Sequence, residues 1–454
     1  MVKQLLFNAN IITMDDKRRQ YSDGAILIED DRIIKIGTRD DVMQDINANV
    51  EQFDLQGKWI LPGLINTHVH TSQQLGRGLA DDVDLLTWLR GRIWPYESNL
   101  TEDDSYISSL MCGLEQIRSG VTCFAEAGGQ HVAGMVRAVT ELGIRATLTK
   151  SCMDMGEGLP KVWQLSTQEL LDIQISHYKK WHNTADGRIR MWFGLRTIFN
   201  NSDELIVQSK ALADQYGVSV HMHVAEIPEE NEYVRATRGA TTVTHLNNLG
   251  VLDHNLLAVH CVWMTDEEIQ MFAEHDVKVS HNPAAAMKVL GFAKIPEMIE
   301  AGICVTIGTD GAPANNRMTL IDEMWLTSLI HKGRLRDPKT MPAETVLAMA
   351  TCEGARAVGW DNEIGSLAVG KKADLIVINP NTVTMLPMHD GVANMVYALR
   401  QHNVESVMAN GQWVMKEQKI LTVDENAIIE EAKKRASAIL DRTGIQLPRR
   451  FNVI

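Results

Sequence analysis

Histidine and carboxylate side chains recur at the ends of apolar segments in this chain, beginning with a His-x-His pair. His68 and His70 end the segment ILPGLINTHVH. Residues i and i+2 of a strand point to the same face, so these two imidazoles can bind one metal ion. Further along, HVAE contributes His223 and GTDGA contributes Asp310. The four side chains supply imidazole nitrogens and a carboxylate oxygen, which suit one divalent ion, Zn²⁺ with an open position for water, or Fe²⁺.

Other polar side chains follow the remaining apolar segments; they are Glu126, Lys150, Arg196, Glu226, His260 and His281. His221 is in register with His223, and we expect it to support the site or to pack in the core. Arg196 is a permanent cation with planar donors, so it can hold a carboxylate, a carbonyl oxygen or a neighbouring acidic side chain. Three tryptophans can stack on a flat heteroaromatic ring or serve packing: Trp88, Trp94 and Trp263.

The elements that position these residues alternate between strand and helix from residue 59 to residue 362. Strands are expected at ILPGLINTHVH, VTCFAEA, IRATLTK, IRMWFGLR, VSVHMHVAE, LLAVHCVW, VKVSHNP and CVTIGTDGA. Intervening segments such as 203–217 and 266–276 have acidic starts and apolar residues at helical spacing. Eight such units predict an α/β fold, a (βα)₈ TIM-like barrel. Sites in that fold lie at the C-terminal ends of the strands, where the polar residues occur.

Both ends of the chain read as short strands separated by turns. Residues 1–58 contain LLFNANIITM and AILIEDDRIIKIG, and residues 363–454 contain ADLIVINP and ESVMANGQWVM. We expect these two parts to form one small composite β-sandwich domain beside the barrel. An amphipathic helix is expected at 423–444, near the end of the chain, as a packing or oligomer element.

Composition narrows the possible partners. The chain has 454 residues, 45% of them apolar, and a net charge of −14. An acidic protein repels nucleic acid and anionic membranes, so the expected partner is a small-molecule substrate. We also expect copies of the chain to form a homo-oligomer. The six cysteines include no C-x-x-C pair, and no run of about 18 apolar residues occurs. These features predict a cytoplasmic protein with reduced thiols.

Several motifs carry a resemblance to a known family. PGLINTHVH, HVAE, AVHC, SHNP and GTDGAPANN resemble the amidohydrolase superfamily, in the branch of aromatic-amine deaminases and s-triazine hydrolases. GSLAVGKKADLIVI resembles the family's return into the composite β domain. The resemblance implies one metal ion at the positions of His68, His70, His223 and Asp310. The fourth strand segment lacks the lysine of two-metal relatives, which agrees with a single ion.

The resemblance also implies a hydrolytic mechanism. A divalent metal can lower the pKa of a water molecule from 15.7 to about 7. Glu226 resembles the family's proton shuttle, which takes the water proton and delivers it to a ring nitrogen of the substrate. His260 is expected to polarise the attacking water, and Asp310 to help carry the second proton to departing ammonia.

The substrate is left open by the motifs. RGLADDVDLLTWLRGRIWPYE resembles methylthioadenosine and S-adenosylhomocysteine deaminases, and it implies that Glu97 binds ribose hydroxyls. Gln73 instead has a spacing from the His pair that is similar to guanine deaminases and triazine hydrolases, and Arg196 and His281 are further expected substrate contacts. We expect deamination of an amino-substituted nitrogen heterocycle, with a purine nucleoside favoured. The alternatives are a free base such as guanine or a pterin, displacement of chloride or an amine from a triazine-like ring, and a relative without enzymatic activity.

Overall fold

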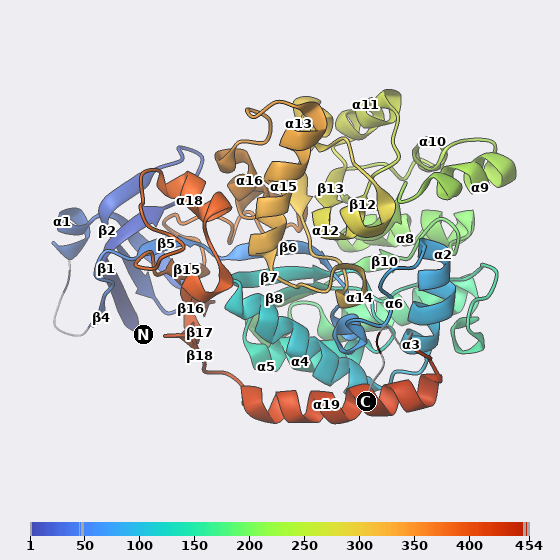
Figure 1. The fold of residues 1–454 in the computed structure, drawn as a ribbon, viewed down its shortest axis with the longest axis horizontal. Coiled ribbons are helices and arrows are strands. Elements are labelled where there is room, and N and C mark those ends of the chain that lie inside the picture. The colour runs from blue at the N-terminus through green and yellow to red at the C-terminus, as the bar shows by residue number, and fades with distance from the viewer. Residues whose placement is uncertain (1, 45, 47–49, 448–450, 452–454) are drawn as a thin grey trace.

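The computed structural model describes residues 2–44, 46, 50–447 and 451, with strands and helices alternating through the middle of the chain (Figure 1). The strands are β1 (Lys3–Ile12), β2 (Gln20–Glu29), β3 (Arg32–Thr38), β4 (Glu51–Asp54), β5 (Trp59–Pro62), β6 (Leu64–Val69), β7 (Val121–Glu126), β8 (Arg145–Leu148), β9 (Ile189–Met191), β10 (Phe193–Leu195), β11 (Val220–Val224), β12 (Leu256–His260), β13 (Lys278–His281), β14 (Val305–Ile307), β15 (Leu375–Ile378), β16 (Val404–Ala409), β17 (Gln412–Lys416) and β18 (Lys419–Ile420). The helices are α1 (Arg39–Met43), α2 (Leu85–Trp88), α3 (Trp94–Ser98), α4 (Glu102–Arg118), α5 (Val132–Leu142), α6 (Thr167–Trp181), α7 (Thr184–Gly187), α8 (Asp203–Tyr216), α9 (Pro228–Arg238), α10 (Thr242–Asn248), α11 (Asp266–Glu274), α12 (Pro283–Ala285), α13 (Ile295–Glu300), α14 (Ala312–Asn315), α15 (Leu320–Leu335), α16 (Ala343–Met349), α17 (Cys352–Ala357), α18 (Gly391–Tyr397) and α19 (Glu425–Thr443).

Parallel strands occupy the centre of the molecule and carry the segments predicted as barrel strands. Hydrogen bonds join them in two parallel sheets, in the orders β6-β7-β8-β9 and β10-β11-β12-β13-β14. Helices separate successive strands along the chain, and α8 and α11 confirm the helices predicted at 203–217 and 266–276. Capping boxes start α4, α6 and α11, where Thr101, Ser166 and Thr265 satisfy backbone N–H groups of the first turn. The observed class is a mixed α/β fold.

The hydrogen-bonded strands do not form the single closed ladder that the sequence predicts. The fourth predicted strand is divided at Trp192, whose backbone N–H donates to the Leu148 carbonyl at 3.0 Å. As a result β9 pairs with β8 while β10 pairs with β11. The two sheets meet again at β14 and β6, where the backbone N–H groups of Thr309 and Asp310 both donate to the His68 carbonyl at 3.0 Å. The end of the last strand therefore lies against the end of the first, which brings Asp310 beside His68.

The two ends of the chain share one mixed sheet. Nine strands of the described residues form it, in the order β18-β17-β16-β15-β5-β1-β2-β3, with β4 paired to β1. β5 and β15 are antiparallel, with Leu61 opposite Ile376, so the two ends are neighbours in the sheet. Alternate side chains of β2 pack on opposite faces, Ile26 in one apolar cluster and Leu27 in another. The sheet confirms that both chain ends contribute, while the division from the barrel at residues 58 and 363 stays a prediction.

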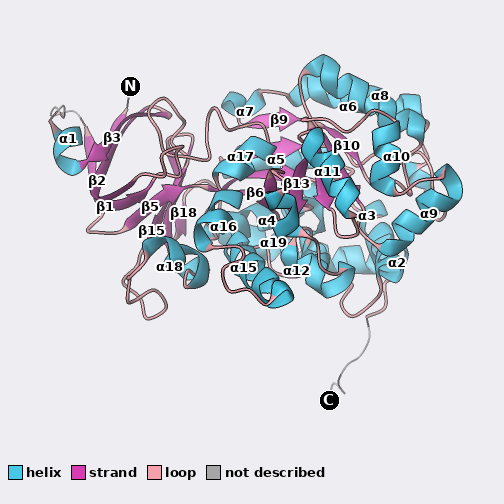
Figure 2. Cartoon of the chain, turned by 90° about the horizontal axis from the view of Figure 1, so that it is seen from above, coloured by secondary structure: helices cyan, strands magenta, loops and turns pink. Residues whose placement is uncertain are grey.

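Helix α19 confirms the helix predicted at 423–444 and lies along α4 at the lower edge of the molecule in Figure 1. Seen from above, α19 and α4 overlap (Figure 2). Arg435 and Arg442 of α19 form ion pairs with the buried carboxylate of Asp104 on α4. These ion pairs hold α19 against α4.

The described residues can be examined for disulfide bonds and for helices that could cross a membrane. The cysteines among them are all free of disulfide bonds. The helices they form are all too short or too polar to cross a lipid bilayer.

Candidate active site

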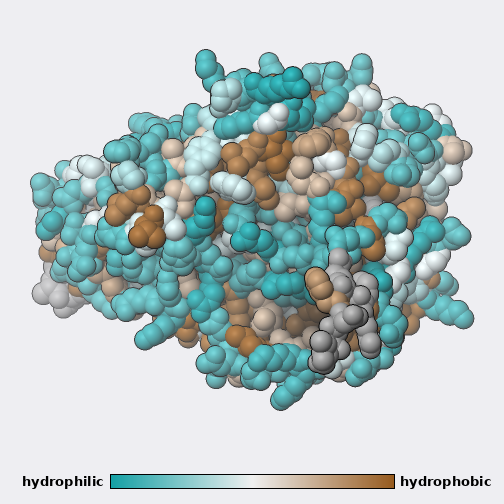
Figure 3. All heavy atoms as spheres, in the orientation of Figure 1, coloured by the Kyte–Doolittle hydropathy of each residue, from teal (hydrophilic) through white to brown (hydrophobic). Residues whose placement is uncertain are grey.

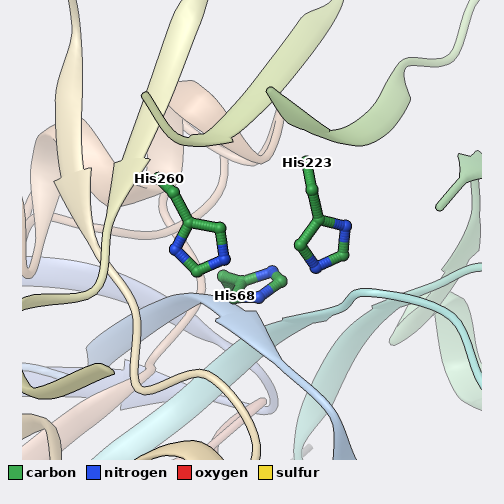
Figure 4. A group of neighbouring side chains, drawn as sticks. All are labelled: His68, His223 and His260. Atoms are coloured by element: carbon green, nitrogen blue, oxygen red, sulfur yellow. The ribbon is translucent and has the colours of Figure 1, made fainter. Parts of the chain in front are cut away.

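The parallel strands bring five of the predicted residues together at their C-terminal ends (Figure 4 shows three of them). His68 lies on β6, with His70 two residues beyond it, while His223 lies on β11 and His260 ends β12. Register pairs Val224 of β11 with His260, so the last two histidines are on adjacent strand ends. Asp310 follows β14, and its backbone is in the left-handed region, with a φ of 61°, which residues other than glycine rarely adopt. The sheet geometry thus collects residues that are up to 242 positions apart in sequence.

The nitrogen and oxygen atoms of this group converge within bonding reach of one ion. His68 Nε2 and His70 Nε2 lie 3.4 and 3.7 Å from Asp310 Oδ1. His70 Nε2 lies 3.3 Å from His223 Nε2. Two overlapping triads have ligand atoms within 4.8 Å of one another, His68 with His70 and Asp310, and His68 with His223 and His260. His68 Nε2 and His260 Nε2 are both buried without a hydrogen-bond partner among the described residues, as expected of atoms that meet a metal ion or a water molecule.

Hydrogen bonds to the far side of two rings orient their free nitrogens. His223 Nδ1 donates to the Arg196 carbonyl at 2.7 Å, which leaves a lone pair on Nε2. His68 Nδ1 lies 3.0 Å from His221 Nε2. His221 therefore supports a predicted ligand, which is one of the two roles expected for it. Outer contacts of this kind fix the tautomer and the ring orientation of metal-binding histidines.

The two carboxylates at the centre have opposite environments. Burial, together with the negative charge of Asp310, raises the pKa of Glu226 from 4.5 to about 8. Burial alone would raise the pKa of Asp310 as well, but the hydrogen bond and charge of His68 outweigh it and lower this pKa to about 2. Glu226 Oε1 lies 3.6 Å from His260 Nε2. The pKa values of the two carboxyl groups are therefore shifted in opposite directions, which is the pattern of an acid and base pair.

Burial dominates the electrostatics of the site histidines. It lowers the pKa of His260 from 6.5 to about 3. It also lowers the pKa values of His70 and His223 well below 6.5, with nearby Arg196 and His68 acting in the same direction. These rings are neutral at physiological pH, the form in which imidazole binds metals.

Glu230 holds the backbone that carries Glu226, and sequence reasoning missed it. Its two carboxylate oxygens accept the backbone N–H groups of Ala225 and Glu226 at 2.8 and 2.9 Å. Ala225 has a left-handed φ of 51°, and this bonding stabilises that conformation. The sequence does contain a signal for this role, because Glu230 lies in the first turn of the helix that begins at Pro228, where a carboxylate can reach the preceding backbone N–H groups.

A cavity of about 240 Å³ opens beside the metal-binding cluster. His70, His223, Glu226, His260 and Asp310 form its polar end. Its other walls are mainly apolar or aromatic and include Leu86, Trp88, Leu89, Trp94, Phe199, Ile227 and Tyr233. Trp263 is not part of this lining; it is 44% exposed, and its ring N–H donates to the Leu290 carbonyl. Two of the three tryptophans considered for ring stacking therefore reach the cavity.

Three expected substrate contacts form a buried polar group at the cavity wall. Gln73 Nε2 donates to Glu97 Oε1 at 2.7 Å, and Arg196 Nη1 lies 3.6 Å from the same oxygen. Glu97 is 4% exposed, and Arg196 alone of the three lines the cavity. Arg196 Nη1 has no hydrogen-bond partner within the described residues. The arginine therefore has both an acidic neighbour and an unused donor.

The remaining strand-end residues point elsewhere. His281 Nε2 lies 3.4 Å from His331 Nε2 on α15. His281 is not among the residues that line the cavity, and its ring lies against this outer helix; its contact with substrate stays a prediction. Lys150 Nζ donates to Gln130 Oε1, also away from the cavity. Glu126 accepts the Thr71 backbone N–H at 2.7 Å and so supports the segment after His70.

A model of the amidohydrolase family matches residues 59–414 of this sequence. The chain belongs to the amidohydrolase family. The resemblance inferred from the motifs is thus confirmed, and the amidohydrolase is a hydrolase that acts on C–N bonds.

Relatives of known activity match this amidohydrolase over nearly its whole length. A 5'-deoxyadenosine deaminase of Methanobrevibacter smithii is 37% identical over 414 residues, which cover 90% of this chain and 92% of that protein. A 5-methylthioadenosine/S-adenosylhomocysteine deaminase of Pelotomaculum thermopropionicum is 36% identical over 445 residues, covering 97% of this chain and 100% of that protein.

Solved structures share the fold. An adenosine deaminase from Xanthomonas campestris with bound zinc superposes with a TM-score of 0.92 at 26% identity, covering 97% of this chain and 99% of that one. A triazine hydrolase variant superposes with a TM-score of 0.89 at 24% identity, covering 96% of this chain and 100% of that one, which shows a common fold. The zinc-bound relative and the buried His and Asp groups support a divalent metal in this amidohydrolase.

Proposed function

We propose that this amidohydrolase is a metal-dependent deaminase of purine nucleosides of the 5'-deoxyadenosine, methylthioadenosine and S-adenosylhomocysteine type, releasing ammonia. One observation carries the proposal. The carboxyl group of Glu226, whose pKa burial raises to about 8, faces the same cavity as His70, His223, His260 and Asp310 and lies 3.6 Å from His260 Nε2. Hydrolytic deamination needs both an activated water and a proton donor for the ring, and these groups can supply them. The deaminase relatives support the substrate class.

The proposed ligands are His68, His70, His223 and Asp310. Their converging atoms and the unpartnered His68 Nε2 fit a divalent ion, and zinc suits three imidazoles and one carboxylate with a place left for water. Iron(II) suits the same donors. An ion held there would acidify a water molecule at neutral pH.

The chain's own groups would move the protons. Glu226 takes a proton from the water and gives it to a ring nitrogen of the base, which makes the adjacent carbon electrophilic. His260, 3.6 Å from Glu226 and 3.9 Å from Asp310 Oδ2, orients the water by a hydrogen bond. Asp310 helps to carry the second proton to the departing ammonia.

The proposed substrate contacts adjoin the cavity through Arg196, which lines it. Glu97, held by Gln73 and close to Arg196, accepts hydrogen bonds from vicinal ribose hydroxyls. Trp88 and Trp94 supply apolar surface for the flat base. The cavity is smaller than the ~300–1,000 Å³ usual for ligand sites, which suits a small flat base with the rest of the substrate toward the opening.

Ammonia release from purified, zinc-loaded protein tests the proposal. Substrates would be 5'-deoxyadenosine, methylthioadenosine, S-adenosylhomocysteine and adenosine, with guanine, a pterin and a chlorinated triazine as alternatives. Glu226→Gln serves as the matched inactive variant. Turnover of nucleosides by the native protein, with no turnover by Glu226→Gln, supports the proposal. Turnover confined to free bases, or chloride release from the triazine without ammonia release from nucleosides, would contradict it.

We further propose that the two parallel sheets together form a (βα)₈ barrel spanning residues 59–362. The bonds from Thr309 and Asp310 to His68 support closure between the first and last strands. Residues 1–58 and 363–454 would form the composite β-sandwich domain, with α19 packed outside it. Two apolar clusters on opposite faces of the shared sheet support such a layered packing.

Homo-oligomer formation is proposed as well. Apolar side chains gather over α15 on the face seen in Figure 3. Trp325 and Leu329, one helical turn apart, are each 39% exposed. Light scattering of the native protein and of a Trp325→Glu, Leu329→Glu double variant measures whether this surface joins copies of the chain. An unchanged oligomer in the double variant would place the interface elsewhere.

A further inference from the structure

His260 has a different neighbour at each ring nitrogen. Its Nε2 faces two carboxylates, with Glu226 Oε1 at 3.6 Å and Asp310 Oδ2 at 3.9 Å. Its Nδ1 lies 3.2 Å from Asn282 Nδ2. Both the histidine and the asparagine are 1% exposed, so the contact between them is shielded from bulk solvent. The proton on this ring is therefore placed by protein groups.

The amide nitrogen of asparagine can only donate hydrogen bonds. His260 Nδ1 must then accept, and the single proton of the neutral ring lies on Nε2. The orientation of the amide has a second support, because the Ser280 carbonyl lies 3.5 Å from the same nitrogen and can also only accept. Turning the amide would place its oxygen against that carbonyl.

The chain holds Asn282 in this orientation. It follows β13 and precedes Pro283, and a residue before proline is restricted to extended backbone. The observed φ of −122° lies in that range, while the ψ of 80° lies below it and still outside the helical region that proline disfavours. On the other side, His260 has a left-handed φ of 71°, which turns its ring from the end of β12 toward the site.

We propose that Asn282 is a positioning residue that holds His260 in the tautomer protonated on Nε2, so that His260 donates a hydrogen bond in the site and does not bind the metal. A nitrogen that carries a proton has no lone pair for a metal. Of the two triads with ligand spacing, this tautomer leaves His68, His70 and Asp310, and it removes the one that includes His260. The tautomer follows from the contacts alone, whereas its effect on catalysis rests on the proposed function.

Nitrogen NMR of zinc-loaded protein with ¹⁵N-labelled histidine tests the tautomer without reference to activity. The His260 signals are identified by their loss in His260→Gln. We expect Nε2 to show the shift of a protonated ring nitrogen and Nδ1 that of an unprotonated one. The reverse assignment would overturn the proposal.

Asn282→Asp reverses the hydrogen bond, since a carboxylate can only accept. The proton should move to Nδ1, and the two His260 signals should exchange character. Asn403→Asp is the matched control, because Asn403 is also fully buried but bonds to Asn379, Thr382 and Arg400 outside the site. This control should leave the His260 signals unchanged. Signals that stay as in the native protein in Asn282→Asp would overturn the role of Asn282.

Kinetics test the consequence for the proposed reaction. Loss of an outer contact of this kind typically costs about 10–100-fold in activity. We expect that loss in kcat for Asn282→Asp, with KM and the zinc content per chain close to native values. Equal loss in Asn403→Asp, or a fall in zinc content that accounts for the lost rate, would overturn the positioning role. If the native protein deaminates no substrate but shows the expected His260 tautomer, the proposed function fails and the tautomer assignment stands.

Discussion

Replacement of Glu226 by glutamine should stabilise the metal-free protein at alkaline pH while it removes most activity. In the folded chain burial raises the pKa of Glu226 from 4.5 to about 8. Between these two values the folded state holds a proton that the unfolded state has released, so stability falls as pH rises through this range. The difference corresponds to at most about 5 kcal/mol at pH 9. Glutamine is neutral throughout and does not have this cost.

Urea unfolding of chelator-treated protein at pH 5, 7 and 9 measures this difference. Native protein and Glu226→Gln should have nearly equal stability at pH 5, and the variant should be several kcal/mol more stable at pH 9. Glu229→Gln is the matched control, because Glu229 is an exposed carboxylate in the same segment and should show no such divergence. With zinc restored, Glu226→Gln should lose about 10²–10⁴-fold in kcat at native metal content, as expected for an acid and base group. A constant stability difference from pH 5 to pH 9 would refute the buried, protonated state of Glu226.

Three further predictions test separate parts of the molecule. His70→Ala and His223→Ala should each remove most of the metal and nearly all turnover, measured by elemental analysis and ammonia release; a variant with full metal content would exclude that residue as a ligand. If the substrate is a nucleoside, Glu97→Ala should lower kcat/KM for nucleosides by an amount that corresponds to the ~1–3 kcal/mol of an unmatched polar partner, and kcat/KM for free bases should stay nearly unchanged. If the substrate is a free base or an acid-bearing heterocycle, Arg196→Met should be the more damaging change. Arg145→Met leaves the carboxylate of Asp374 buried without the 2.8 Å ion pair between the barrel and the end sheet, and denaturation should show a loss of about 3–5 kcal/mol; a loss below 1 kcal/mol would mean that the pair is dispensable.

The residues that converge on the site could be found from the sequence because their signals are local. His68 and His70 share a strand face by the two-residue repeat, and parallel strands bring their C-terminal ends together. The placement of His223, His260 and Asp310 beside them follows from the same rule, and their separations in the structure agree with it. The family could likewise be recognised from the short motifs around these positions, because such motifs are contiguous in sequence.

Contacts between side chains far apart in sequence depended on packing, which no local pattern encodes. The link from Gln73 to Glu97 and Arg196, and the turn of His281 toward His331, follow from how helices and loops settle around the barrel. Backbone bonding at Trp192 likewise divided a strand whose apolar run reads as continuous.

The amino-acid sequence determined which side chains lie at the strand ends, because the two-residue repeat of a strand and the position of its end are set by residues that are neighbours in sequence. The folded structure decided the protonation of those groups and their partners. Burial raises the pKa of Glu226, the carboxylate of Glu230 holds its backbone, and the amide of Asn282 faces His260. Desolvation and hydrogen-bond partners exist only once distant segments have packed together, so the chemistry of the site is a property of the tertiary structure.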